Sequence, residues 1–153
     1  MPETHHTVVA DTVNDSTKAR SEVLIRVRYA ETDPLGTFYN SRALEWFECG
    51  RTELLRSMGT PYTRLESSGV FLPVTVAHVE YLGRARYDDL LRITTTGTME
   101  GRAQVRCDVE IEQAATRVPV TRGYTVHAFC DASGKPTRPP SWFVEALKEG
   151  ARK

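Results

Sequence analysis

The sequence predicts an α+β fold in which an antiparallel sheet of about five strands curls around one long helix. Three observations lead to this prediction: five strand-like runs, one long segment with helical periodicity, and links of three to seven residues between the last four runs. Short links join antiparallel neighbours directly. One helix cannot cover both faces of such a sheet, so its outer face is left to solvent or a partner subunit.

Periodicity and turn chemistry predict the individual elements. Residues alternate over Val23–Ala30, which predicts a strand, and Pro34 and Gly36 then provide a turn. Apolar residues recur at helical spacing over 41–58, where the central Gly50 predicts close contact with another backbone. The later strands are expected at 71–82, 90–99, 103–113 and 119–130, with a loop at 60–69 and a short helix from Ser141.

Composition places the chain among ordinary globular proteins. It has 153 residues, 40% hydrophobic and 26% charged, with 20 basic and 20 acidic side chains. The zero formal charge gives no overall attraction to nucleic acid or to a membrane surface. We expect a polar, disordered leader at 1–21 without signal-peptide features, then one domain at 22–153. Three separated cysteines predict reduced thiols in a cytoplasmic protein with no metal and no cofactor.

Four motifs in order resemble the hot-dog-fold thioesterases, in the branch of 4-hydroxybenzoyl-CoA thioesterase and the YbgC-like acyl-CoA thioesterases. They are YAETDPLGTFYN, FECGRTELLR, YLGRARYDDLL and TVHAFCDASGKPTRPP, and the likeness runs from 23 to about 147. The resemblance implies a substrate that is an acyl-CoA or an acyl carrier protein thioester. It also implies a homodimer, or a tetramer of two dimers, with each active site between two subunits.

The resemblance further implies that Asp33 acts on the thioester carbonyl, as nucleophile or as general base. Backbone N–H groups at the helix start, near Tyr39 and Asn40, would polarise the carbonyl oxygen. The residue pattern allows this chemistry, because a helix N-terminus favours negative charge on an acid and on a developing oxyanion alike. The simpler interpretation is that Asp33 only caps a turn before Pro34.

Asn40 departs from the family, since YbgC-like members usually carry His at this position. Asn cannot shuttle a proton, although its side chain can orient a water and its N–H remains available. A protein that binds acyl thioesters without cleaving them is therefore the alternative function. A hot-dog dehydratase or hydratase needs a His near the helix, and 29–69 contain none.

The remaining site candidates are assigned to binding. An acyl pocket wall is expected from Leu35, Gly36, Phe38, Tyr39 and Phe71. Arg84 and Arg86 are expected to hold the CoA phosphates or an acidic carrier protein, because guanidinium suits phosphate. The alternative is a solvated turn in which they pair with Asp88 and Asp89.

Other ionisable residues are expected to be structural. Glu48 is a second candidate acid, but an ion pair with Arg51 one turn later is the simpler expectation. Glu31 is expected to be a carboxylate on the rim of the site. His78 and His127, both inside strand-like runs, are expected to be hydrogen-bonded structural histidines.

Overall fold

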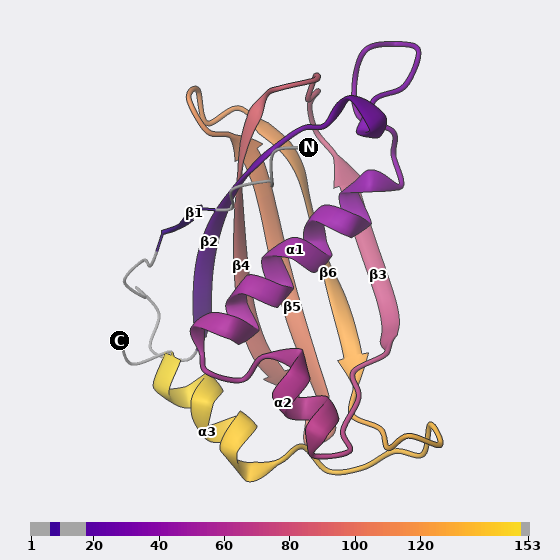
Figure 1. Cartoon of the computed structure of the whole chain (residues 1–153), viewed down its shortest axis with the longest axis vertical. Helices are drawn as coiled ribbons and strands as arrows, with labels where there is room; N and C mark the ends of the chain where they lie inside the picture. The colour runs from indigo at the N-terminus through magenta and orange to yellow at the C-terminus, as the bar shows by residue number, and fades with distance from the viewer. Residues whose placement is uncertain (1–6, 10–17, 151–153) are drawn as a thin grey trace.

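The computed structural model describes residues 7–9 and 18–150, and it shows an antiparallel sheet curled around one long helix (Figure 1). The strand order in the sheet is β1-β2-β4-β5-β6-β3. The strands are β1 (Thr7–Val9), β2 (Ala19–Arg26), β3 (Val74–Tyr81), β4 (Leu90–Glu100), β5 (Gln104–Gln113) and β6 (Pro119–Ala128). Five long strands confirm the predicted sheet, to which β1 adds three residues beside β2.

Helix α1 (Arg42–Ser57) lies across the concave face of the sheet, as predicted (Figure 1). Ser41 is its N-cap, and Gly59 after its C-terminal end has a φ of +74°. A Cβ added at Gly50 would lie 2.8 Å from Ile93 Cγ2 and would clash with the Thr95 side chain. The helix backbone therefore lies against side chains of β4, and not against another backbone as predicted; this close approach explains a glycine that costs about 1 kcal/mol of helix propensity.

The first long strand differs from its predicted bounds. β2 begins at Ala19, and it ends at Arg26, before the 3-10 turn η1 (Tyr29–Glu31). The turn forms because Glu31 accepts the backbone N–H of Arg28, which stops strand pairing there. Most of the predicted leader, 1–6 and 10–17, lies outside the described residues, while residues 19–21 belong to β2.

Two short helices close the lower end of the molecule in Figure 1. The prediction of an irregular loop at 60–69 was wrong, because α2 (Tyr62–Ser67) follows Pro61 and buries Leu65. Helix α3 (Ser141–Gly150), predicted from its cap, packs Phe143 edge-on against Phe129 at 5.3 Å. In the described ranges, no helix is long and apolar enough to cross a bilayer.

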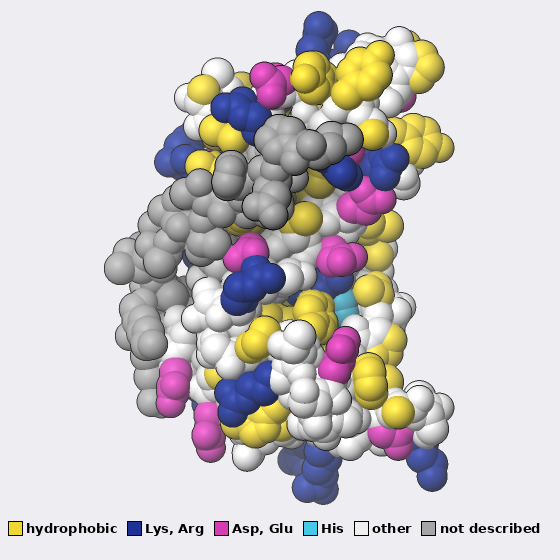
Figure 2. All heavy atoms as spheres, viewed as in Figure 1, with side chains coloured by type: hydrophobic (Ala, Val, Ile, Leu, Met, Phe, Trp, Pro, Cys, Tyr) yellow, Lys and Arg dark blue, Asp and Glu magenta, His cyan; other side chains and the backbone are white. Residues whose placement is uncertain are grey.

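Strand β3 occupies one edge of the sheet and pairs only with β6 within the described residues. Its side chains are largely exposed, including Val74 at 50% and Val76 at 45%. Figure 2 shows hydrophobic side chains gathered along this edge. An unpaired edge with exposed apolar residues is a natural place for another strand to add.

Candidate active site

Asp33 sits at the tip of a tight hairpin between η1 and α1. Its N–H donates to Thr37 O at 2.8 Å, and its Oδ1 accepts the N–H of Leu35 at 2.8 Å. Gly36, with a φ of +79°, returns its N–H to Asp33 O at 2.9 Å. Within the described chain, Oδ2 of Asp33 has no hydrogen-bond donor. The carboxylate thus shapes the turn with one oxygen and presents the other.

The start of α1 provides two unused backbone donors. Tyr39 N–H donates to Glu31 O at 2.8 Å, so it does not belong to the predicted donor set. The N–H groups of Asn40 and Ser41 form no hydrogen bond to any described residue, and helical bonding begins with Arg42 N–H to Tyr39 O at 2.9 Å. Ser41 was missed by the motif argument, although its N-cap position identifies such a donor.

Glu31 is not the rim carboxylate that was expected. It is buried, at 5% exposure, and its two oxygens accept Arg28 N–H at 2.7 Å and Trp46 Nε1–H at 3.1 Å. The indole in turn lies 4.8 Å from the ring of Phe38. A buried carboxylate therefore fixes the hairpin to the first turns of α1.

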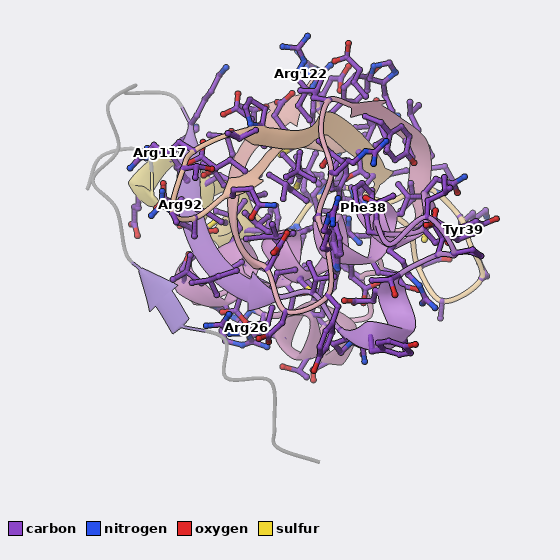
Figure 3. All side chains as sticks on the ribbon, turned by 90° about the horizontal axis from the view of Figure 1, so that it is seen from above. Arg26, Phe38, Tyr39, Arg92, Arg117 and Arg122 are labelled. Carbon is purple, nitrogen blue, oxygen red and sulfur yellow. The ribbon has the colours of Figure 1, made fainter. Side chains whose placement is uncertain are left out.

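The predicted acyl wall is not assembled within one chain. Phe38 is buried in the core and lies toward the middle of the molecule, whereas Tyr39 points to its periphery (Figure 3). Leu35 is 78% exposed and Gly36 is also exposed. Phe71 precedes β3, whose eight residues separate it from the Asp33 end by roughly 25 Å at about 3.3 Å per residue.

Arg84 and Arg86 lie beside the hairpin. They flank Ala85, whose carbonyl accepts the N–H of Phe38 at 2.8 Å. Asp89 accepts the backbone N–H of Arg86 at 2.8 Å, and neither guanidinium forms an ion pair with a described carboxylate. The alternative in which these arginines pair with neighbouring aspartates is thus not what the structure shows. Both charges are exposed and available to an anion.

The expected Glu48–Arg51 ion pair does not form. Glu48 is exposed on the outer side of α1, whereas Arg51 points inward and is only 8% exposed. Residues three apart are neighbours on a helix, about 60° apart around its axis, so the pair is absent because Tyr62 and Thr125 hold the Arg51 guanidinium in the core. Among the described residues, no carboxylate lies within ion-pair distance of Arg51.

Arg51 instead belongs to a buried polar network that sequence reasoning missed. Its Nε donates to Tyr62 Oη at 2.7 Å, and one terminal nitrogen donates to Thr125 Oγ1 at 3.4 Å. His127 joins with Nε2 2.9 Å from Thr125 Oγ1 and Nδ1 3.0 Å from Leu72 O. His127 is therefore a hydrogen-bonded structural residue, as expected.

This network makes stability depend on pH. Burial, and then the charge of Arg51, lowers the pKa of His127 from 6.5 to about 4. The unfolded chain binds this proton first, so stability is full above pH 6.5 and is lost as pH falls toward 4. We expect urea unfolding to show a loss of about 2–3 kcal/mol from this residue between pH 7 and pH 4.5. His127→Gln should remove that part of the slope, and an unchanged slope would contradict the assignment.

We assign no chemistry to the other potentially reactive side chains, His78 and the cysteines. His78 is exposed on β3 and stacks on Tyr124 at 5.3 Å. Cys49, Cys107 and Cys130 are unpaired, and burial raises the pKa of Cys107 to about 12, which keeps that thiol protonated. Within the described ranges, no three His, Cys, Asp or Glu side chains gather as a metal-binding group.

The family sequence model of the thioesterase-like superfamily matches residues 27–147 of this chain. The chain belongs to this superfamily. Among curated relatives, the putative acyl-CoA thioesterase YneP of Bacillus subtilis is 38% identical over 71 residues, which are 46% of this chain and 51% of YneP. The acyl-CoA thioesterase YbgC of Haemophilus influenzae is 39% identical over 72 residues, 46% of this chain and 53% of YbgC. The matches span about half the length of these relatives.

A solved structure of comparable shape is that of the DHNA-CoA thioesterase of Staphylococcus aureus. It aligns with this thioesterase-like chain at a TM-score of 0.76 and 28% identity, covering 87% of this chain and 90% of the other. The curled sheet around one long helix and this likeness confirm the predicted hot-dog fold. The resemblance to the YbgC-like branch is confirmed as well.

Proposed function

We propose that this chain hydrolyses the thioester of an acyl-CoA or an acyl carrier protein, giving a free acid and a thiol. One observation carries the proposal: a carboxylate oxygen of Asp33 and the N–H groups of Asn40 and Ser41 are all unengaged within the described chain. Asp33 pairs with Thr37 across the hairpin, and Thr37 is three residues before Asn40. At about 3.3 Å per residue, the acid and the helix start therefore lie within roughly 10 Å of each other. We propose that the thioester carbonyl is held between them.

The chemistry follows from where charge develops. Asp33 either attacks the carbonyl carbon or takes a proton from the attacking water, and both routes place negative charge on the carbonyl oxygen. The N–H groups of Asn40 and Ser41, reinforced by the dipole of α1, stabilise that charge. The C–S bond then breaks and the sulfur leaves as a thiolate, which takes up the proton that the water releases. The same water supplies the second oxygen of the acid. Asn40 needs no proton-transfer role in this scheme.

The carrier of the acyl group is proposed to meet Arg84 and Arg86. Their exposed guanidinium groups give a local positive patch on a chain of zero formal charge. Such a patch suits the phosphates of CoA and the acidic surface of a carrier protein. We favour CoA because the named relatives are acyl-CoA thioesterases. The three unpaired thiols support a reducing compartment, and we propose the cytoplasm.

The working unit is proposed to be a homodimer in which two β3 strands pair antiparallel across a two-fold axis. Tyr81 Oη, at the end of β3, donates to Asn40 O at 2.7 Å, so this end of the strand adjoins the site. Antiparallel pairing brings the beginning of the other β3 to the same place. The partner subunit's Phe71 would then lie beside the site, which explains why Phe71 and Asp33 are far apart within one chain. Two dimers joined by their outer sheet faces would give a tetramer.

The pairing predicts a clear effect of charge on the β3 edge. Val76→Lys should convert the dimer to a monomer at micromolar concentration, because it places a lysine on each of the two strand edges that pair. Sedimentation velocity measures the change. Ala115→Lys, in the exposed β5–β6 turn, adds the same charge and should leave the dimer intact. A dimeric Val76→Lys protein would exclude this edge as the interface.

Hydrolysis itself is tested with a panel of acyl-CoA thioesters of varied chain length and ring content. Release of free thiol, read with a thiol-reactive dye, shows turnover. The alternative, a protein that only binds acyl thioesters, gives bound ligand and no thiol. Binding without thiol release across the panel would therefore replace the proposed activity with that alternative.

A further inference from the structure

A surface hollow of about 530 Å³ opens at the start of β3, at the opposite end of the strand from Asp33. Val70, Phe71, Leu72 and Pro73 give it a mainly apolar wall, to which α2 contributes Tyr62. The hollow adjoins the beginning of the β3 edge. In the proposed dimer, it therefore adjoins the other subunit's hairpin and helix start.

Tyr62 adds a side chain that carries a hydroxyl group to the lining of this hollow. Its oxygen accepts the Arg51 Nε–H at 2.7 Å, and no described residue accepts the Tyr62 O–H proton. Arg51 is nearly buried and has no carboxylate partner in the described chain, so its charge polarises the phenol without neutralisation. Burial raises the pKa of Tyr62 despite that charge, so the hydroxyl keeps its proton at neutral pH. The result is a fixed donor with an unused hydrogen.

The rim of the hollow limits what can reach that donor. Glu66 and Asp131 both line it. Hydrogen bonds from Ser133 and Lys135 lower the pKa of Asp131, which keeps that carboxylate charged. A carboxylate on the ligand would meet like charge, whereas a neutral hydroxyl or keto oxygen would not.

We propose that the hollow receives the acyl group of a thioester held at the other subunit's Asp33, and that Tyr62 selects acyl groups that carry a neutral oxygen. This inference rests on the proposed function and on the β3 pairing. The apolar wall accommodates the carbon skeleton, and the Tyr62 hydroxyl donates to the oxygen. Tyr62 is a specificity-determining residue, and Arg51 positions its hydroxyl.

The test measures binding and not turnover. Unreactive six-carbon thioether analogues of acyl-CoA, with no chain oxygen or with one hydroxyl at each successive carbon, are titrated into the full-length protein by calorimetry. At least one hydroxylated analogue should bind the wild type about tenfold more tightly than its parent, as expected for one well-placed hydrogen bond. Tyr62→Phe should bring that ratio close to one and leave the affinity of the parent unchanged.

Two further variants keep the result interpretable. Tyr87→Phe removes an exposed hydroxyl elsewhere and should preserve the tenfold preference. Phe71→Leu alters the apolar wall and should weaken both ligands several-fold without changing their ratio. The ratio does not depend on the fraction of folded protein, so a destabilised Tyr62→Phe sample still reports it.

Each contrary outcome has a distinct meaning. If no hydroxyl position improves binding, or if the preference survives in Tyr62→Phe, the selective role of Tyr62 is wrong. If Phe71→Leu changes neither affinity, the acyl group does not occupy the hollow. Absence of thiol release from reactive thioesters would overturn the proposed hydrolysis alone, because the binding ratios are measured without turnover.

Discussion

Replacing Asp33 with Asn is expected to lower kcat for thioester hydrolysis by about a thousandfold, the range for loss of a nucleophile or general base. The fold should persist, because an Asn Oδ1 can still accept the N–H of Leu35 that closes the turn. Initial rates of thiol release, measured with the best substrate of the acyl-CoA panel, give the effect.

Asp108→Asn is the matched control for that substitution. Asp108 lies on the outer face of β5, where it pairs with Arg106, and its loss should leave kcat within about twofold, since surface ion pairs contribute little. Thermal unfolding shows whether each variant is folded. A folded Asp33→Asn protein with the wild-type rate would remove Asp33 from the chemistry and leave it a turn residue.

Glu31→Ala should have the largest effect on stability among substitutions near the site. It leaves the partly buried Arg28 N–H and the buried Trp46 indole N–H without an acceptor, which costs about 3 kcal/mol of unfolding free energy. Activity should fall as well, because Glu31 fixes the hairpin to α1. Urea denaturation measures the first effect and thiol release the second.

Two further glutamate variants serve as comparisons for Glu31→Ala. Glu31→Gln retains one acceptor oxygen and should lose only about 1 kcal/mol. Glu45→Ala removes an exposed acid paired with Arg42 at 2.9 Å and should change stability by less than about 0.5 kcal/mol. Equal stabilities for Glu31→Ala and Glu45→Ala would show that the buried carboxylate does not hold the hairpin in place.

Regular periodicity explains what could be predicted of the fold. Helix α1 and the five long strands repeat apolar residues along one face, and Gly50 indicated a close approach, although its neighbours are side chains of β4 and not another backbone. The end of β2 was missed because it depends on a side-chain contact, in which the Glu31 carboxylate accepts the Arg28 N–H and is held by Trp46. Helix α2 was missed because it depends on the core that receives Leu65.

The turn and the helix start that carry the candidate site could be predicted from the sequence, whereas the distances between their side chains could not. The Asp-Pro-Leu-Gly turn located Asp33, and the helix start located Asn40. Neither spacing nor composition shows that Arg51 turns into the core, because a charged residue at that position usually remains on the surface. Phe71 was expected in the acyl pocket wall beside Asp33, whereas the topology places the two residues at opposite ends of β3.

The place of β3 in the sheet also has a consequence for folding. The strand follows α1 and α2 in the chain, yet its neighbour is β6, with His78 opposite Tyr124. During synthesis, β3 therefore emerges well before the strand it pairs with, and both of its hydrogen-bonding edges stay open until β6 arrives. Contacts so distant in the chain slow folding. Over that interval, the newly made chain is open to strand-mediated aggregation, and docking of β6 closes the first of the two edges.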